Sequence, residues 1–385
     1  MIPCEVWAEI NTKALSDNIR NLKRFLKGSV RFMAVVKADA YGHGAVETAL
    51  RAVDAGADAL GVARLGEALE LRHAGISAPV LIFGKTRPAQ AARLVEYGLT
   101  QTVCGYREAA DLSARMRALG HRIRVHIKMD TGMGRLGILA IDGENGVNRK
   151  ACRDAAVEEI YAICRLDGLA CEGIYTHFAA ADEADKTMTV QQLAIFEDIV
   201  ARLEKKGVRF DIRHAANSAA LIDMPETHLD MVRAGISIYG YYPSKKVNHE
   251  SVQLTPAMTL KSRIVHIKTV GPGFAVSYGA TARTEKKTTI ATVAIGYADG
   301  LSRSLSSIGE MTLRGRLVPV MGRVCMDSTM LDTGGVTDAA VGDEVTIFGN
   351  PENGALSADR LADQTGTISY EVLTSVSRRV CRIYV

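Results

Sequence analysis

The chain has 385 residues, 47% hydrophobic and 23% charged, which is typical of a soluble globular protein long enough for two domains. Basic side chains number 47 and acidic ones 43, and this net charge of +4 is scattered along a chain with 5% aromatic residues. The composition therefore predicts neither a nucleic-acid partner nor a membrane partner. Residues 1–10 contain two glutamates and lack the apolar core of a signal peptide, and no apolar run is long enough to cross a membrane.

The seven cysteines contain no Cys-x-x-Cys pair. The nearest two, Cys164 and Cys171, are poorly spaced for a metal-binding knuckle, so we expect no metal site. The simplest interpretation is that the thiols are reduced, as in cytoplasmic proteins. We therefore predict a cytoplasmic location.

The first predicted elements are a strand, Cys4–Ile10, and a helix, Thr12–Leu26. Eight strand-like runs then alternate with helical patterns over about 235 residues, which is typical of a (β/α)8 barrel. The predicted strands are Phe32–Val36, Ala59–Ala63, Val80–Phe83, Thr100–Cys104, Ile123–Met129, Glu172–His177, Ile212–Ala216 and Met231–Ile236. The predicted helices between them include Ala45–Ala55, Leu65–Ala74, Pro88–Tyr97, Tyr106–Leu119, Ala155–Arg165 and Thr189–Lys205.

The pattern changes near Val252, where short strands separated by glycine-rich turns replace the alternation. The predicted strands here are Met258–Val270, Thr288–Ile295, Glu310–Met321, Val324–Asp332, Glu344–Phe348 and Arg379–Val385. Two short helices are expected at Ser357–Gln364 and Ser369–Val376. We assign residues 11–243 to the barrel, and residues 1–10 and 244–385 to a mostly-β domain that includes the N-terminal strand. The fold class is α/β, a barrel followed by a mostly-β domain.

A lysine stands at the end of the first barrel strand, in the stretch Ala34-Val35-Val36-Lys37-Ala38-Asp39-Ala40-Tyr41-Gly42-His43-Gly44. Burying a lysine is costly, and a desolvated amine loses its charge readily, which suits it to Schiff-base chemistry. For most lysines a solvated position at a strand end would be the better interpretation. This stretch resembles the pyridoxal-phosphate lysine motif of bacterial alanine racemases, and the resemblance extends over essentially the whole chain.

Other polar residues follow the barrel strands at the same end, where barrel enzymes build their sites. They are Tyr41, Arg135, His177, Asn217, Ser218 and Arg233, with Gly235 and Ile236 closing the eighth strand. Taken singly, His177 would be a satisfied core histidine, Arg135 a surface arginine and Asn217 a helix N-cap. Together they predict one site.

The resemblance implies a role for each of these positions. Lys37 would anchor pyridoxal phosphate covalently, and Arg233 would contact its ring nitrogen. An arginine there does not give up its proton, so the ring would stay unprotonated and transamination would be discouraged. The phosphate would be bound by Tyr41, Ser218, Gly235, Ile236 and Tyr370, since hydroxyl and backbone N–H groups suit an anion. Asn217 would support these phosphate-binding residues.

The mostly-β domain also carries matches to the racemase pattern. Val276-Ser277-Tyr278-Gly279 resembles the catalytic tyrosine motif, and Cys325-Met326-Asp327 resembles the loop that binds the substrate carboxylate. The stretches 294–300, with Tyr297, and 367–371, with Tyr370, match as well. In the family the tyrosine and the methionine enter the partner subunit's barrel, so the resemblance implies a homodimer with shared sites.

Inverting an α-carbon requires one base on each face. The resemblance implies Lys37 on one face and Tyr278 of the partner subunit on the other, with His177, backed by Arg233, as the neighbour that lowers the tyrosine pKa. Arg135 and Met326 would hold the substrate carboxylate. Strand alternation also sends Lys128 into the barrel, where it is either carbamylated or paired with Asp130.

The implied reaction is interconversion of L-alanine and D-alanine, a source of D-alanine for peptidoglycan precursors. The sequence does not separate a biosynthetic from a catabolic role. A serine or broader-specificity racemase is the nearest alternative, and a non-catalytic pyridoxal-phosphate-binding protein is the alternative from another class. Segment 142–152 matches no motif and suggests no function.

Overall fold

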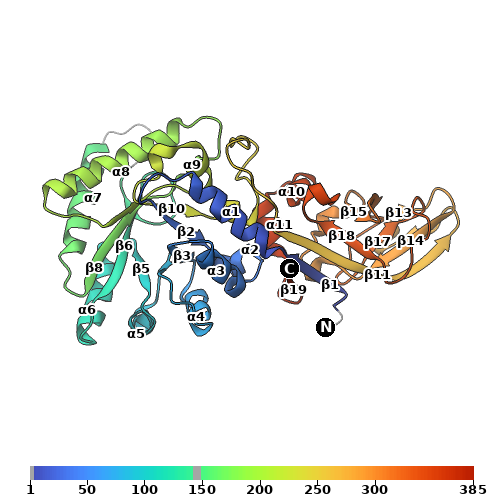
Figure 1. Cartoon of the computed structure of the whole chain (residues 1–385), viewed down its shortest axis with the longest axis horizontal. Helices are drawn as coiled ribbons and strands as arrows, with labels where there is room; N and C mark the ends of the chain where they lie inside the picture. Colours follow the sequence, from blue (N-terminus) through green and yellow to red (C-terminus); the bar gives the residue numbers. More distant parts are fainter. Residues whose placement is uncertain (1–3, 142–148) are drawn as a thin grey trace.

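The structure is a computed structural model that describes residues 4–141 and 149–385. A barrel of strands and helices and a mostly-β part lie one after the other along its long axis (Figure 1). The predicted fold class is confirmed. Most of segment 142–152, for which the sequence suggested no function, lies outside the described residues.

Parallel strands form the barrel wall in the order β10-β2-β3-β4-β5-β6-β8-β9. Their bounds are β2 Arg31–Val35, β3 Ala59–Val62, β4 Val80–Ile82, β5 Thr100–Val103, β6 Ile123–Asp130, β8 Leu169–Tyr175, β9 Ile212–His214 and β10 Met231–Ala234. A short β7, Ile138–Leu139, extends β6 at its edge. Between β9 and β10, Asp230 N–H donates to Arg213 O at 3.0 Å and Arg233 N–H to Ala216 O at 3.1 Å, so the barrel is nearly closed.

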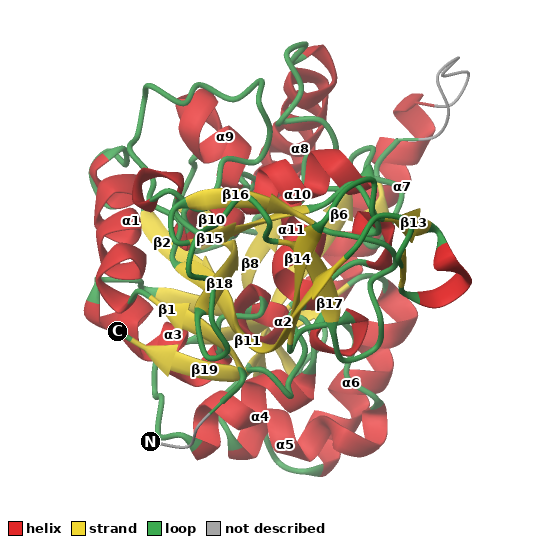
Figure 2. Ribbon diagram, turned by 90° about the vertical axis from the view of Figure 1, so that its right-hand side faces the viewer, coloured by secondary structure: helices red, strands yellow, loops and turns green. Residues whose placement is uncertain are grey.

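Helices cover the outside of the barrel (Figures 1 and 2). Their bounds are α1 Thr12–Arg24, α3 Ala45–Asp54, α4 Leu65–His73, α5 Ala91–Glu96, α6 Tyr106–Ala118, α7 Arg149–Cys164, α8 Thr187–Lys205 and α9 Ser218–Asp223. Helix α1 shows why these segments pack as they do. Asn11 caps its first turn by accepting from Ala14 N–H, and Leu15, Ile19 and Leu22 bury one face.

The mostly-β part is an eight-stranded sheet whose main path runs β16-β15-β18-β11-β1-β19, with β14 paired to β11 and β17 paired to β14. The bounds are β1 Val6–Ile10, β11 Met258–Val270, β14 Thr288–Val293, β15 Glu310–Leu313, β16 Arg316–Pro319, β17 Thr329–Asp332, β18 Glu344–Phe348 and β19 Cys381–Tyr384. The N-terminal strand β1 pairs with β11 and β19, as predicted. Helices α10, Ala358–Thr365, and α11, Ser369–Ser375, lie between this sheet and the barrel (Figure 1).

Two predicted strands of this part are wrong in detail. The run Glu310–Met321 is a hairpin, because Arg314 and Gly315 both take positive φ and reverse the chain. Only the end of Val324–Asp332 is a strand, because Cys325 N–H donates to Ser328 O at 3.0 Å and closes a turn. The turn brings the loop around Met326 to the surface.

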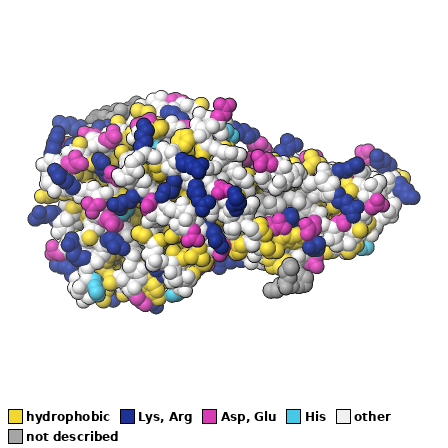
Figure 3. Space-filling view, in the orientation of Figure 1, with side chains coloured by type: hydrophobic (Ala, Val, Ile, Leu, Met, Phe, Trp, Pro, Cys, Tyr) yellow, Lys and Arg dark blue, Asp and Glu magenta, His cyan; other side chains and the backbone are white. Residues whose placement is uncertain are grey.

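Charged side chains of both signs are spread over the face shown in Figure 3. Within residues 4–141 and 149–385, no helix is long and apolar enough to cross a membrane. In the same residues, no group of three or more His, Cys, Asp or Glu side chains is arranged to hold a metal ion.

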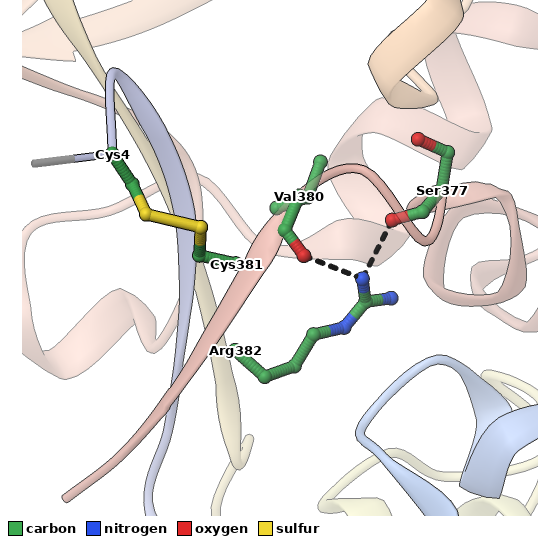
Figure 4. Close-up of a disulfide and its surroundings, with 5 residues drawn as sticks. All are labelled: Cys4, Ser377, Val380, Cys381 and Arg382. Atoms are coloured by element: carbon green, nitrogen blue, oxygen red, sulfur yellow. Dashed lines mark hydrogen bonds between the residues drawn. A yellow bond between two sulfur atoms is a disulfide. The ribbon is translucent and has the colours of Figure 1, made fainter. Parts of the chain in front are cut away.

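Cys4 and Cys381 form a disulfide that joins the two ends of the chain (Figure 4). The prediction of reduced thiols is therefore wrong for this pair. The two cysteines are 377 residues apart, and they meet because β1 and β19 run side by side. The local spacing of cysteines in the sequence cannot predict a disulfide between residues so far apart.

Candidate active site

A cavity of about 710 Å³ opens at the carboxyl ends of the barrel strands and is bordered by α11. It brings together side chains that the sequence had scattered over almost the whole chain. Of the predicted site residues, those that line it are Lys37, Tyr41, Lys128, Arg135, His177, Asn217, Ser218, Arg233, Gly235, Ile236 and Tyr370. Tyr278, Tyr297, Met326 and Asp327 do not line it.

The segment after β2 takes a conformation that the sequence did not predict. Instead of a plain loop, element α2, Lys37–Tyr41, is one turn in which Ala38, Asp39, Ala40 and Tyr41 are left-handed, with φ between 51° and 54°. A left-handed conformation costs an L-residue about 1–2 kcal/mol, so the surrounding structure must hold this turn in place. The turn directly follows Lys37, and it places the lysine and Tyr41 in the same cavity.

Hydrogen bonds support the turn from within the barrel. Glu67 accepts from Ala38 N–H at 2.7 Å, and Asp39 accepts from Ala45 N–H at 2.8 Å. The His43 ring lies with Nδ1 3.1 Å from both Ala40 O and Tyr41 O, so Nδ1 must carry the proton. Burial lowers the pKa of His43 to about 4, and the ring acts as a neutral donor.

Lys37 lies among cations. Burial lowers the pKa of its amine, and the positive charges of Arg135 and Arg233 lower it further, whereas Glu67 opposes them. No carboxylate of the described residues forms an ion pair with Lys37. The amine is thus poised to lose its proton, which is the property that a nucleophile or a general base requires.

Arg233 is almost completely buried and also lacks a carboxylate partner within the described residues. Its Nη2 donates to the carbonyls of Thr176 and Ala215, each at 2.9 Å, and to His177 Nδ1 at 3.1 Å. Its Nη1 donates to His214 Nδ1 at 2.9 Å. Burial lowers its pKa to about 10, which still leaves it charged at neutral pH.

Two buried histidines that sequence reasoning missed hold Arg233 in place. Because His214 accepts from the arginine through Nδ1, its proton lies on Nε2, which donates to His126 Nδ1 at 2.8 Å. His126 then carries its proton on Nε2, 3.4 Å from a Glu172 carboxylate oxygen. The chain of contacts runs through the barrel to the arginine. The signal was present, since His126 shares a strand face with Lys128, and His214 is the only polar inward side chain of β9.

His177 does not carry the positive charge expected of a residue that lowers a tyrosine pKa. Burial lowers its pKa well below the usual value, and the charges of Arg233 and Lys128 add to this effect. The ring is therefore neutral, with its proton on Nε2 because Nδ1 accepts from Arg233. The positive charge at this corner of the site belongs to the arginine and not to the histidine.

A small group of polar residues, Ser218, Gly235, Tyr41 and Tyr370, lies beside the turn and is called the polar cup below. Ser218 Oγ accepts from Gly235 N–H at 2.8 Å and lies 2.9 Å from Ser237 Oγ. A Cβ added at Gly235 would lie 2.8 Å from the Tyr41 hydroxyl, so a side chain here would displace that hydroxyl. Asn217 caps α9 by accepting from Ala220 N–H, which is the N-cap role considered for it.

Two phenols complete the cup. The rings of Tyr41 and Tyr370 lie 6.0 Å apart, and Tyr370 comes from α11. Burial raises the pKa of both hydroxyls, so each remains a hydrogen-bond donor. Hydroxyl groups and glycine backbone converge here, and this donor set fits a phosphate group.

Lys128 is buried as predicted, but it does not pair with Asp130. The aspartate instead accepts from the backbone N–H groups of residues 132–135, at 2.9–3.1 Å, and shapes the loop that carries Arg135. The Lys128 amine lies 5.2 Å from the centre of the Tyr175 ring. Burial, together with the charges of Arg233 and Arg135, lowers its pKa to about 8.

The predicted residues of the mostly-β part lie on its surface. Tyr278 is 72% exposed and Met326 52% exposed, far more than large apolar side chains usually are. Asp327 and the buried Asp299 both bind Arg379, at 2.8 and 2.7 Å. This pairing holds the loop of Met326 beside Tyr297, whose N–H donates to Cys325 O.

The sequence profile of the alanine racemase N-terminal domain matches residues 10–243, and that of the alanine racemase C-terminal domain matches residues 257–384. The chain belongs to the alanine racemase family. An alanine racemase of Desulfosudis oleivorans is 53% identical over 98% of this chain and 96% of its own length. One of Methanococcus maripaludis is 44% identical over the full length of both.

Solved alanine racemases share the fold. That of Clostridium difficile 630 is 40% identical with a TM-score of 0.93, covering 100% of this chain and 97% of the other. A Bartonella henselae alanine racemase described with covalently bound pyridoxal phosphate is 25% identical with a TM-score of 0.86, and all of both chains is covered. Alanine racemases depend on pyridoxal phosphate and are isomerases, so this chain is an amino-acid racemase.

We predict that the Lys128 amine is carbamylated. A neutral amine adds carbon dioxide and releases a proton, and the resulting anion would lie near Arg135 and Arg233, which form no ion pair with a carboxylate of the described residues. With ¹³C-labelled bicarbonate, NMR of the protein should show a carbamate resonance that disappears in Lys128→Arg and persists in Lys85→Arg. Lys85 is an exposed lysine paired with Glu108 and serves as the control. Absence of the resonance, or its survival in Lys128→Arg, would contradict the prediction.

Proposed function

We propose that the protein interconverts L-alanine and D-alanine with pyridoxal phosphate and two proton-transferring residues. The observation that carries the proposal is the placement of Lys37, an amine with a lowered pKa, between a buried arginine and an anion-binding cup. Full-length similarity to alanine racemases supports the choice of substrate.

The cavity suits the cofactor at both of its ends. Lys37 would hold it covalently, while Ser218, Tyr41, Tyr370 and the backbone at 235–236 would bind its phosphate. Arg233 would face the ring nitrogen, because its Nη atoms are occupied by carbonyls and imidazoles and none of the described residues accepts from Nε. When bound, pyridoxal phosphate supplies an electron sink that makes removal of the α-proton feasible.

One chain would supply a proton-transferring residue on only one face of the substrate α-carbon. The Lys37 amine, with its lowered pKa, takes or returns the α-proton on the face where it lies. Arg135, at the mouth of the cavity, would bind the substrate carboxylate. A base on the opposite face is still required, and we assign it to Tyr278 of the partner subunit.

We propose a homodimer with shared sites. Within one chain, Tyr278 and Met326 lie on the exposed surface of the mostly-β part and do not line the cavity. Exposed apolar side chains grouped with polar neighbours are typical of an interface. A two-fold dimer would place the same residues of each chain at the other chain's cavity.

On this proposal residues 11–243 form the cofactor-binding domain, and residues 1–10 with 244–385 form the domain that supplies the second base. Pairing of β1 with β11 and β19 supports this division. We further propose a cytoplasmic enzyme that provides D-alanine for peptidoglycan precursors. The disulfide between Cys4 and Cys381 argues against this location, because the cytoplasm keeps most thiols reduced.

The direct test of the reaction is chiral chromatography after incubation of the purified protein with L-alanine and, separately, with L-serine. We expect D-alanine to accumulate until the two enantiomers are equal, with serine converted more slowly. Faster conversion of serine would contradict the substrate assignment. Recovery of unchanged L-alanine and L-serine by a yellow protein would favour the non-catalytic alternative.

Sharing of the sites predicts complementation between inactive variants. Homodimers of Lys37→Ala and of Tyr278→Ala should each be nearly inactive. A mixed dimer regains one site that contains both bases, so an equal mixture with free exchange of subunits should recover roughly a quarter of wild-type activity. Tyr106, an exposed tyrosine on barrel helix α6, provides the control, since Tyr106→Ala should be active by itself. Proven subunit exchange without recovery would place both bases on one chain.

A further inference from the structure

Helix α11 and the C-terminal segment that follows it both pack onto the left-handed turn. A Cβ added at Gly42 would lie 2.3 Å from Leu373 O, and one added at Gly44 would lie 2.0 Å from the Tyr384 hydroxyl. Both glycines also have positive φ, 84° and 93°. A side chain at Gly42 would meet the backbone of α11, and at Gly44 the positive φ itself favours glycine.

Arg382 joins the two segments. Its Nε and Nη2 both donate to Gly42 O, at 3.0 and 2.9 Å. Nη1 donates to Ser377 O at 2.6 Å and Val380 O at 2.8 Å (Figure 4), and Nη2 also donates to Val376 O at 2.8 Å. All these acceptors are main-chain carbonyls, and Arg382 forms no ion pair with any carboxylate that the structure describes.

The arginine is itself fixed at its backbone. It lies in β19 opposite Ala8 of β1, and the preceding residue, Cys381, is bonded to Cys4 (Figure 4). Burial lowers the pKa of Arg382, and nearby Asp39 opposes that effect. The guanidinium remains charged, and its planar set of donors reaches the turn and its own segment at once, which a lysine amine does not do.

We propose that Arg382 is a positioning residue that holds the left-handed turn and thereby presents Lys37 and Tyr41 to the cavity. The inference rests on the proposed role of Lys37 as the cofactor anchor. Four consecutive residues of the turn have positive φ, and such strained backbone persists only where the surrounding structure holds it. Arg382 supplies the contact from the mostly-β part, so this part of a chain shapes that chain's own site as well as the partner's.

Hydrogen exchange of the full-length protein tests the proposal without relying on catalysis. The amides of Gly42, His43 and Gly44 bond to carbonyls within the turn, so their exchange reports its opening. In Arg382→Lys these amides should exchange roughly tenfold faster, the change expected for loss of one hydrogen bond. Amides of β6, across the barrel, should keep their wild-type rates.

Arg378 provides the matched control, because it is exposed, lies in the same segment and makes no hydrogen bond or ion pair to the described residues. Arg378→Lys should leave exchange in the turn unchanged. In the wild-type protein, the turn and β19 should open together at one rate, since they form one unit. Faster exchange in Arg382→Lys that is confined to β1 and β19, or a wild-type turn that stays closed after β19 has exchanged, would overturn the proposal. Either outcome is independent of whether the enzyme racemises alanine.

Discussion

The site is organised around buried and half-buried positive charges that form no ion pair with a carboxylate of the described residues. Lys37, Lys128 and Arg233 converge on one cavity, and none of them forms an ion pair with a described carboxylate. In a poorly solvated site such a group of cations is costly, and the protein reduces the cost by lowering the pKa of both lysines and keeping His177 neutral. The remaining charge attracts anions. The phosphate of the cofactor and the carboxylate of an amino acid are therefore the natural ligands of this cavity.

The second constraint is conformational. Four consecutive non-glycine residues, Ala38 to Tyr41, are left-handed, at a cost of about 1–2 kcal/mol each. Contacts from three directions offset this cost: Glu67 from helix α4, His43 from the segment itself and Arg382 from the C-terminal strand. The turn places Lys37 and Tyr41 in the cavity together. Electrostatics and backbone geometry thus depend on each other, because the strained turn brings the amine among the cations.

Much of this arrangement was predictable from the sequence. Repeated alternation of strands and helices indicated the barrel, and polar residues at the strand ends indicated the cavity, because the carboxyl ends of parallel strands meet at one edge. Period-two alternation in β6 correctly sent Lys128 inward. The roles of Tyr278 and Met326 came from resemblance alone, and a single chain leaves these residues on its surface.

The features that sequence reasoning missed depend on long-range contacts. Residues 38–41 have ordinary helix and loop propensities, so nothing local indicates a left-handed turn, and the contact that Arg382 makes to its end comes from 340 positions away. The disulfide between Cys4 and Cys381 likewise requires the pairing of β1 with β19. His214 was overlooked because a buried histidine is uninformative until its partners, His126 and Arg233, are known.

The central claim is that Lys37 is the amine on which the site is built. Borohydride reduction of the yellow, purified protein, followed by proteolysis and mass spectrometry, tests it most directly. We expect one peptide to carry the reduced cofactor, with the modification on Lys37. A label on Lys128 or on any other lysine, or no label on a protein that retains its colour, would contradict the account.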